Sequence, residues 1–159
     1  MERLWAPWRA SYVSDAGSRG GCFLCAAATG EADDLVVARD ATTITLLNRF
    51  PYNTGHLMVA PAEHVRDLLA AGDEGSAALM VAGRRAMRAL AVALAPDGFN
   101  VGVNQGPAAG ASVEHVHLHV VPRWDGDTNY MPVLGGTKVL SELLGETAAR
   151  LRRAFRRLE

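Results

Sequence analysis

Three histidines alternate with apolar residues in the segment His115-Val116-His117-Leu118-His119 of this 159-residue chain. Successive side chains of a β-strand point to opposite faces, so a strand over residues 113–121 places the three imidazoles together on one face. Core packing alone gives no reason for such a row of imidazoles. Two chemistries fit the pattern: a metal ion held by three histidines, or a nucleophilic imidazole supported by its neighbours.

A loop of small residues, Asn104 to Ser112, leads into these histidines and includes Gly106 and Gly110. Loops of this composition can turn backbone N–H groups toward an anion, and Ser112 adds a hydroxyl group. By itself the loop is equally compatible with a long hairpin connection. Beside three histidines it favours a phosphate site, and therefore a nucleophilic imidazole.

The only two cysteines, Cys22 and Cys25, form a Cys-x-x-Cys pair. In a reducing compartment this spacing indicates metal binding or redox chemistry rather than a structural disulfide. A tetrahedral zinc site needs two further ligands. His64 and one of the three alternating histidines are available to supply them, so we predict zinc. The alternative is a pair of small buried apolar side chains.

Hydrophobic periodicity predicts the elements that carry these residues. Strands are expected over residues 35–39, 43–48, 56–60, 99–103 and 113–121, after an irregular segment over 1–21. A short helix near 65–71 precedes a long helix that begins at Asp73 and ends near Leu94, before Pro96. A last helix runs from about residue 137 to 158. Short links between consecutive strands suggest an antiparallel meander in a single α+β domain over residues 1–159.

Composition and charge limit the function classes. A hydrophobic content of 49% and a charged content of 21% are typical of a globular protein, and a net charge of −1 argues against capture of nucleic acid. We interpret the arginine-rich stretch at 150–157 as the solvated face of an amphipathic helix. No apolar run reaches the ~20 residues of a membrane span. The N-terminus also lacks the apolar core of a secretory signal, so we expect a cytoplasmic protein with no membrane partner.

The run from His115 to Val121 matches the signature His-φ-His-φ-His-φ-φ, with φ apolar, and the chain resembles the histidine-triad (HIT) family over nearly its whole length. Five further segments carry the resemblance: Leu-Trp-Ala-Pro-Trp-Arg near the N-terminus, the cysteine pair, residues 48–56, residues 98–102, and Pro-Arg-Trp at 122–124. The chain looks most like bacterial members that cleave diadenosine tetraphosphate with water or inorganic phosphate. The resemblance implies a HIT-like fold with a five-stranded antiparallel sheet, and a homodimer.

The resemblance also implies roles for individual residues. His117 is the expected nucleophile, which forms a covalent nucleotidyl-histidine, while His119 and His56 hold phosphate oxygens and assist charge transfer. The nucleotide is expected to contact Asn48 through its ribose, and the loop residues Asn104, Gly110, Ser112 and Val113 through its phosphate. A structural zinc is expected on Cys22, Cys25, His64 and His115. Magnesium is expected only as a companion of the substrate polyphosphate.

Two positions bear on the acceptor of the nucleotide. Many hydrolases of the family carry glutamine where this chain has Ala111, whereas phosphorylase-like members carry a small residue there and a tryptophan such as Trp124. Hydrolysis and phosphorolysis both remain open at this point. Two other readings are hydrolysis of adenosine phosphoramidates or other mononucleotide conjugates, and nucleotide binding with little turnover. The presence of His117 argues against the last reading, because a binding protein needs no nucleophile.

Overall fold

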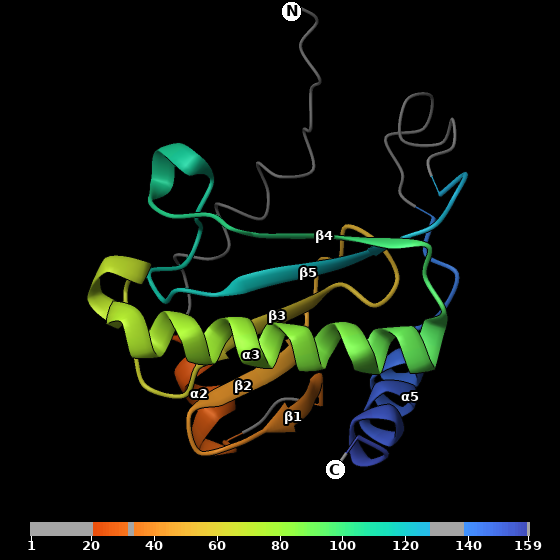
Figure 1. Cartoon of the computed structure of the whole chain (residues 1–159), viewed down its shortest axis with the longest axis horizontal. Helices are drawn as coiled ribbons and strands as arrows, with labels where there is room; N and C mark the ends of the chain where they lie inside the picture. Colours follow the sequence, from red (N-terminus) through yellow and green to blue (C-terminus); the bar gives the residue numbers. More distant parts are fainter. Residues whose placement is uncertain (1–20, 32–33, 128–138, 159) are drawn as a thin grey trace, which may run out of the picture.

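The sheet has five strands, all paired antiparallel, in the order β1-β2-β3-β5-β4 (Figure 1). A computed structural model describes residues 21–31, 34–127 and 139–158, so most of the predicted irregular segment 1–21 lies outside the described residues. The strands are β1 (Val36–Arg39), β2 (Thr43–Leu47), β3 (Leu57–Pro61), β4 (Gly98–Val103) and β5 (Leu118–Arg123). This arrangement confirms the predicted α+β class and the five-stranded antiparallel sheet.

The predicted meander is wrong at one position, because β5 lies between β3 and β4 instead of beyond β4. The chain leaves β3 through a long helix, returns along β4 at the outer edge, and then enters β5 between the two. The first four strands agree with the predicted ranges to within one residue at each end. The strand that carries the histidines does not, and its later start is described below.

The long helix, α3 (Leu68–Leu94), joins the two helices that the sequence predicts. Its first turn is capped by Asp67, whose carboxylate accepts the Ala70 N–H at 2.8 Å, and the helix resumes at Asp73, where the sequence predicts the long helix to begin. The predicted boundary between the two helices is present as a non-helical break at Gly72, which has φ 65° and ψ −173°. Only glycine adopts this extended left-handed conformation without strain. The residues of α3 that are buried against the sheet all follow this break, from Leu79 to Leu90.

The last helix, α5 (Leu144–Arg156), begins seven residues later than predicted. Leu140 and Leu143, which continue the apolar periodicity toward the N-terminus, are 38% and 72% exposed and do not pack on the core. Within the helix Leu151 and Phe155 are buried, while Arg150, Arg153, Arg156 and Arg157 at its end are exposed. These four arginines lie on the solvated side of an amphipathic helix, as predicted, whereas Arg152 is half-buried and donates from Nε to the Val36 carbonyl at 2.8 Å.

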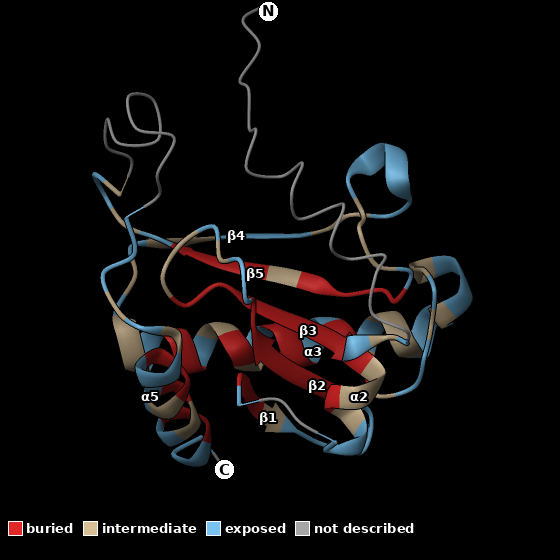
Figure 2. Ribbon diagram, turned by 180° about the vertical axis from the view of Figure 1, so that it is seen from behind, coloured by how far each residue is buried: buried red, intermediate tan, exposed pale blue. Residues whose placement is uncertain are grey.

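The two faces of the sheet are covered unequally (Figure 2). On one face α3 and α5 bury the main core, which includes Leu57, Val59, Leu118 and Val120. On the other face a seven-residue helix that the sequence did not predict, α2 (Phe23–Thr29), packs on β2 and β3 through Leu24 and Ala27. No described helix covers β5 and β4 on that face. Among the described helices, none is both long and apolar enough to cross a membrane.

Candidate active site and metal cluster

The three alternating histidines do not lie on one strand. Strand β5 begins only at Leu118, so His115 and His117 precede it and His119 alone is part of it. The segment just before β5 is bonded to the segment after β3, because the Val116 N–H donates to the Val65 carbonyl at 2.7 Å. The apolar residues of the motif are buried, as the alternation predicts. The predicted strand therefore begins too early. Because His115 and His117 lie outside β5, the three imidazoles do not share one face of a strand, and His115 has different surroundings from His117 and His119.

His115 turns into a cluster with both cysteines. Its Nδ1 lies 3.3 Å from Cys22 Sγ and 3.6 Å from Cys25 Sγ, and His64 Nδ1 lies 3.2 Å from Cys25 Sγ. The four potential ligand atoms are all within 4.8 Å of one another. The structure thus brings together the four residues that were predicted to bind zinc.

The donor set fits zinc. Tetrahedral bonds of ~2.3 Å to sulfur and ~2.0–2.1 Å to nitrogen place neighbouring ligand atoms roughly 3.5 Å apart, close to the separations seen here. His115 is fully buried, and its Nε2–H donates to the Pro61 carbonyl at 3.0 Å, which leaves the Nδ1 lone pair facing the thiols. A backbone carbonyl on the second ring nitrogen is the usual support of a metal-binding histidine. Burial also lowers the pKa of His115 and so favours the neutral ring that a metal requires.

His117 has one ring nitrogen bonded and one available. Its Nδ1 lies 2.8 Å from the His115 carbonyl oxygen. Because a carbonyl only accepts, Nδ1 carries the proton, and the neutral ring presents an unprotonated Nε2. Burial lowers the pKa of His117, against a smaller opposing effect of that hydrogen bond, so the ring is neutral at pH 7. This is the state of an imidazole that can act as a nucleophile.

His56 and His119 form a hydrogen-bonded pair beside His117. His56 is fully buried, and its Nδ1 accepts the Tyr52 N–H at 3.0 Å. A neutral His56 therefore carries its proton on Nε2, which lies 3.0 Å from His119 Nδ1. That bond in turn leaves the proton of a neutral His119 on Nε2. The rings of His117 and His119 pack edge to face, with their centroids 4.8 Å apart.

These contacts exclude one of the two chemistries considered for the three histidines. His115 Nδ1 faces the cysteines, His117 Nδ1 faces a carbonyl oxygen and His119 Nδ1 faces His56. The three imidazoles thus have separate partners and do not converge on a single metal ion. The remaining chemistry is a nucleophilic imidazole with a neighbouring pair of histidines.

A hollow of about 490 Å³ lies over the half of the sheet that no described helix covers. His119, Val121 and Arg123 line it from β5, since alternate residues of a strand share one face. Tyr52 and Asn104 lie on its border. The hollow therefore offers space for a molecule that reaches His119 and extends along β5 toward Arg123.

Of the residues predicted to bind nucleotide, only Asn104 is among those that line this hollow, and the others have the following surroundings. Asn48 is buried, and its side-chain oxygen accepts the Phe50 N–H at 2.9 Å. Ser112 and Val113 are half-buried, and Val113 packs on the core beneath α2. Gly110 has φ 87° and donates its N–H to the Pro107 carbonyl at 3.0 Å. In this conformation the Gly110 amide therefore stabilises the loop itself.

Sequence reasoning missed the part played by Tyr52. Besides its N–H bond to His56, its ring stacks on the His56 imidazole with centroids 4.8 Å apart and planes 17° apart. The available signal was the tight turn between Pro51 and His56. Gly55 has φ +83°, and a Cβ there would lie 2.5 Å from Leu94 Cδ1, so this turn packs closely on the end of α3.

Comparison with known proteins agrees with the fold and the site. The model of the HIT domain matches residues 29–126, and the chain belongs to this family. A protein of Mycobacterium tuberculosis H37Rv named AP-4-A phosphorylase is 41% identical over 157 residues, which cover 92% of this chain and 80% of that protein.

Two solved structures show the same architecture. One is a Zn-bound histidine triad family protein from Mycobacterium smegmatis, with a TM-score of 0.74 and 33% identity over 87% of this chain and 95% of the other. The second is a hypothetical histidine triad nucleotide-binding protein from Sulfolobus tokodaii, with a TM-score of 0.73 and 25% identity over 86% and 93%.

Proposed function

We propose that this protein is a cytoplasmic enzyme that cleaves dinucleoside polyphosphates, such as diadenosine tetraphosphate, at the α-phosphate. The observation that carries the proposal is the state of His117: its Nδ1–H is bound to the His115 carbonyl and its Nε2 lone pair is available. The name of the 41% identical mycobacterial relative supports the same substrate class. The mechanism below follows from the hydrogen bonds of the three histidines.

In the first step, His117 Nε2 attacks the α-phosphorus. A P–N bond forms while the bond from the α-phosphorus to the bridging oxygen breaks, and the remaining nucleoside polyphosphate leaves with the electron pair. The ring becomes cationic, and the bond from Nδ1–H to the His115 carbonyl strengthens as that charge develops. The product of this step is a nucleotidyl-histidine, as is usual for nucleophilic catalysis.

His119 faces the leaving group in this proposal. Its Nε2–H points away from His56, and its side chain lines the hollow beside β5. In this proposal His119 donates that proton to the bridging oxygen as it departs. The four-residue separation of His119 and Arg123 on the strand spans about 13 Å, enough for a polyphosphate chain.

We further propose that inorganic phosphate is the acceptor in the second step. A phosphate oxygen attacks the same phosphorus, the P–N bond breaks, and a nucleoside diphosphate is released from His117. Two observations support phosphate over water: Ala111 stands where many hydrolases of the family carry glutamine, and the mycobacterial relative is named a phosphorylase. Diadenosine tetraphosphate and phosphate then give ATP and ADP.

The residues that bind the nucleotide are proposed by resemblance and position. Asn48 is assigned to the ribose, and Asn104, Gly110, Ser112 and Val113 to the phosphate region. Asn104 borders the hollow that His119 also lines, which supports its assignment. Magnesium arrives with the polyphosphate, and no described side chain is assigned to it.

The zinc is proposed to be structural. Its four ligands, from α2, the segment after β3 and the segment before β5, leave no coordination position for substrate. The ion would join these three segments to one another. The mycobacterial structure described as Zn-bound supports the assignment.

We also propose a homodimer, as the resemblance implies. β4 is at the edge of the sheet, and Val101 on it is 41% exposed. Met80 and Val81 on α3 are likewise 56% and 61% exposed. Light scattering of the purified protein tests this part, and a monomer at micromolar concentration would overturn it.

The products formed from diadenosine tetraphosphate test the function. ATP and ADP that appear only with inorganic phosphate are the expected result. ATP and AMP without phosphate would show that water is the acceptor. If the dinucleotide is not cleaved in either condition, its place as substrate is wrong, and adenosine phosphoramidates or other mononucleotide conjugates are the next candidates.

A further inference from the structure

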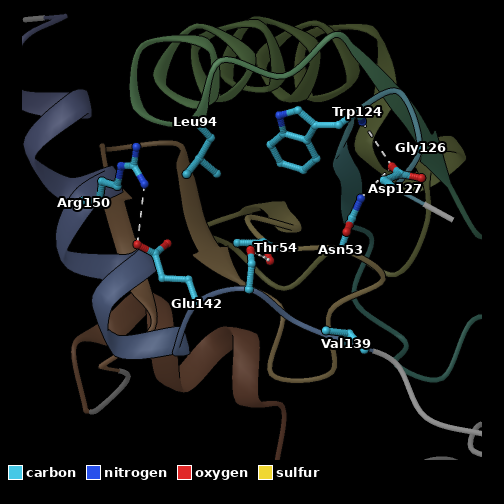
Figure 3. Close-up of a pocket in the computed structure, with 10 residues that line it drawn as sticks. Asn53, Thr54, Leu94, Trp124, Gly126, Asp127, Val139, Glu142 and Arg150 are labelled. Carbon is cyan, nitrogen blue, oxygen red and sulfur yellow. Dashed lines mark hydrogen bonds and ion pairs between the residues drawn. The ribbon is translucent and has the colours of Figure 1, made fainter. Parts of the chain in front are cut away.

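The side chain of Asp127, eight residues after His119, accepts hydrogen bonds from three residues. It accepts two bonds of 2.7 Å from the Arg123 guanidinium. It also accepts one of 2.8 Å from Asn53 Nδ2 and one of 3.2 Å from the Trp124 N–H, and both of these are drawn in Figure 3. Its side chain is only 9% exposed. Hydrogen bonds to a carboxylate are shorter and stronger than neutral ones, so Asp127 fixes its partners firmly.

One of these partners belongs to the turn that supports the histidine pair. Asn53 donates from Nδ2 to the Pro122 carbonyl at 3.2 Å as well as to Asp127, so its side chain is attached to the end of β5. Its own carbonyl accepts the His56 N–H at 3.0 Å. The preceding residue, Tyr52, donates its N–H to His56 Nδ1.

A continuous series of bonds therefore runs from Asp127 to His119. It passes from the carboxylate to the Asn53 amide, through the turn to the Tyr52 N–H, then to His56 and to His119 Nδ1. The Tyr52 N–H is the donor that keeps His56 Nδ1 unprotonated. If the turn shifts, both tautomers of His56 become accessible, and the proton of His119 is no longer restricted to Nε2.

We propose that Asp127 and Asn53 are positioning residues, which hold the Tyr52–His56 turn so that His119 presents its Nε2 proton to the leaving group. The catalytic consequence rests on the function proposed above for His119. The structural part, the placement of protons on His56 and His119, is a property of the free protein and does not depend on the substrate.

The test combines imidazole ¹⁵N NMR of the free, metal-loaded protein with steady-state kinetics on diadenosine tetraphosphate and phosphate. Asp127→Ala and Asn53→Ala are both expected to give mixed tautomer signals for His56, where the unsubstituted protein shows protonated Nε2 alone. Each variant should lose about tenfold in kcat, while KM changes by less than about twofold. Because both side chains act through the hydrogen bond between Asn53 and Asp127, the kcat of the double variant should be no lower than that of the more impaired single variant.

A matched control separates positioning from general loss of stability. Asp40 also accepts several bonds in a turn, from the N–H groups and hydroxyls of Thr42 and Thr43, but that turn lies between β1 and β2. Asp40→Ala should reduce stability without changing kcat or the His56 signals. Asn53→Ala keeps the ion pair of Asp127 with Arg123, so it tests the proposal even if Asp127→Ala fails to fold.

The proposal is overturned if His56 keeps a single tautomer in Asn53→Ala, or if the losses of the two variants multiply in the double variant. These results are distinguishable from failure of the proposed function. If the unsubstituted protein does not cleave the dinucleotide but the tautomers mix as expected, the positioning role stands and the substrate is wrong.

Discussion

Two groups of imidazoles lie close together in this protein and have opposite arrangements. In the metal cluster, His115 is bonded to a carbonyl through Nε2 and turns Nδ1 toward two thiols. At the candidate active site, His117 is bonded to a carbonyl through Nδ1 and leaves Nε2 available. The two residues are separated by one position in the sequence. The nitrogen that the backbone engages thus differs between the proposed zinc ligand His115 and the proposed nucleophile His117.

The two groups also differ in how their members are connected. The ligand atoms of the metal cluster converge within 4.8 Å of one another, as binding of a single ion requires. At the candidate active site, a series of hydrogen bonds instead connects the Tyr52 N–H to His56 and His56 to His119, and the His117 ring packs beside the His119 ring. We therefore expect changes in the cluster to affect mainly stability, and changes in the series to affect mainly turnover.

The largest effect is expected for His117→Asn. The substitution removes the Nε2 nucleophile but keeps a side chain of similar polarity, so turnover should fall by at least about 10⁴-fold. Affinity for AMP, measured by calorimetry, should change only a few-fold, as a ratio of roughly 3 or less. Turnover near the original rate would contradict a covalent mechanism.

Loss of the metal should have the next largest effect, and on stability. Metal analysis should find one zinc per chain, and Cys22→Ser should cost more than about 4 kcal/mol of folding free energy. The melting temperature should then fall by roughly 10 °C, as measured by circular dichroism. Chelation should likewise lower stability before it affects chemistry.

A ligand exchange sharpens this prediction. His64→Cys gives three cysteines and one histidine, which is also a common zinc set, so zinc and stability should be retained. Absence of zinc from protein purified without chelator would remove the metal site from the account. Loss of turnover on chelation without any loss of folded structure would contradict the separation of the two groups.

A smaller effect is expected for His119→Gln. Glutamine keeps an N–H donor but cannot transfer a proton, so turnover of diadenosine tetraphosphate should fall about 10²-fold. The loss should shrink for a nitrophenyl ester of AMP, because that leaving group needs no proton. Equal losses with the two substrates would show that His119 does not assist departure of the leaving group.

The smallest effects are expected for two glycines, one at the end of the helix that carries Cys25 and one directly before His56. Gly55 and Gly30 both have positive φ, but only at Gly55 would a Cβ meet other atoms, with Leu94 Cδ1 at 2.5 Å. Gly30→Ala should cost about 1 kcal/mol from backbone strain, and Gly55→Ala about 2–3 kcal/mol from strain and the close contact. Chemical denaturation measures both, and equal costs would mean that Leu94 moves freely aside.

The sequence predicted which residues come together better than it predicted the exact bounds of the elements that carry them. Runs of β-forming residues bounded by turn residues located four strands to within a residue. Residue type and spacing selected Cys22, Cys25 and His64, and the family resemblance added His115 as the fourth member of the cluster. The beginning of β5 was not predictable from alternation, because the apolar residues before Leu118 are buried even though they are outside the strand. Their placement depends on a bond to Val65, some fifty residues earlier in the chain.

Other errors have similar causes in long-range packing. Helix α2 is only seven residues long and shows too little periodicity to be predicted, yet it buries Leu24 and Ala27 fully. The contact between Asn53 and Asp127 joins residues 74 positions apart, which no local pattern reveals. Residue types thus indicated which side chains are candidates for chemistry, and tertiary contacts determine which of their atoms are engaged in hydrogen bonds.

The central claim is that His117 Nε2 becomes covalently bonded to the nucleotide. Protein mixed with diadenosine tetraphosphate in the absence of phosphate should be quenched in alkali and analysed by mass spectrometry of the peptide that contains residues 115–119. The account predicts one adenylyl group on His117, which disappears with release of ADP when phosphate is added before the quench. An adenylyl group on any other residue, or one that persists in the presence of phosphate, would contradict the account.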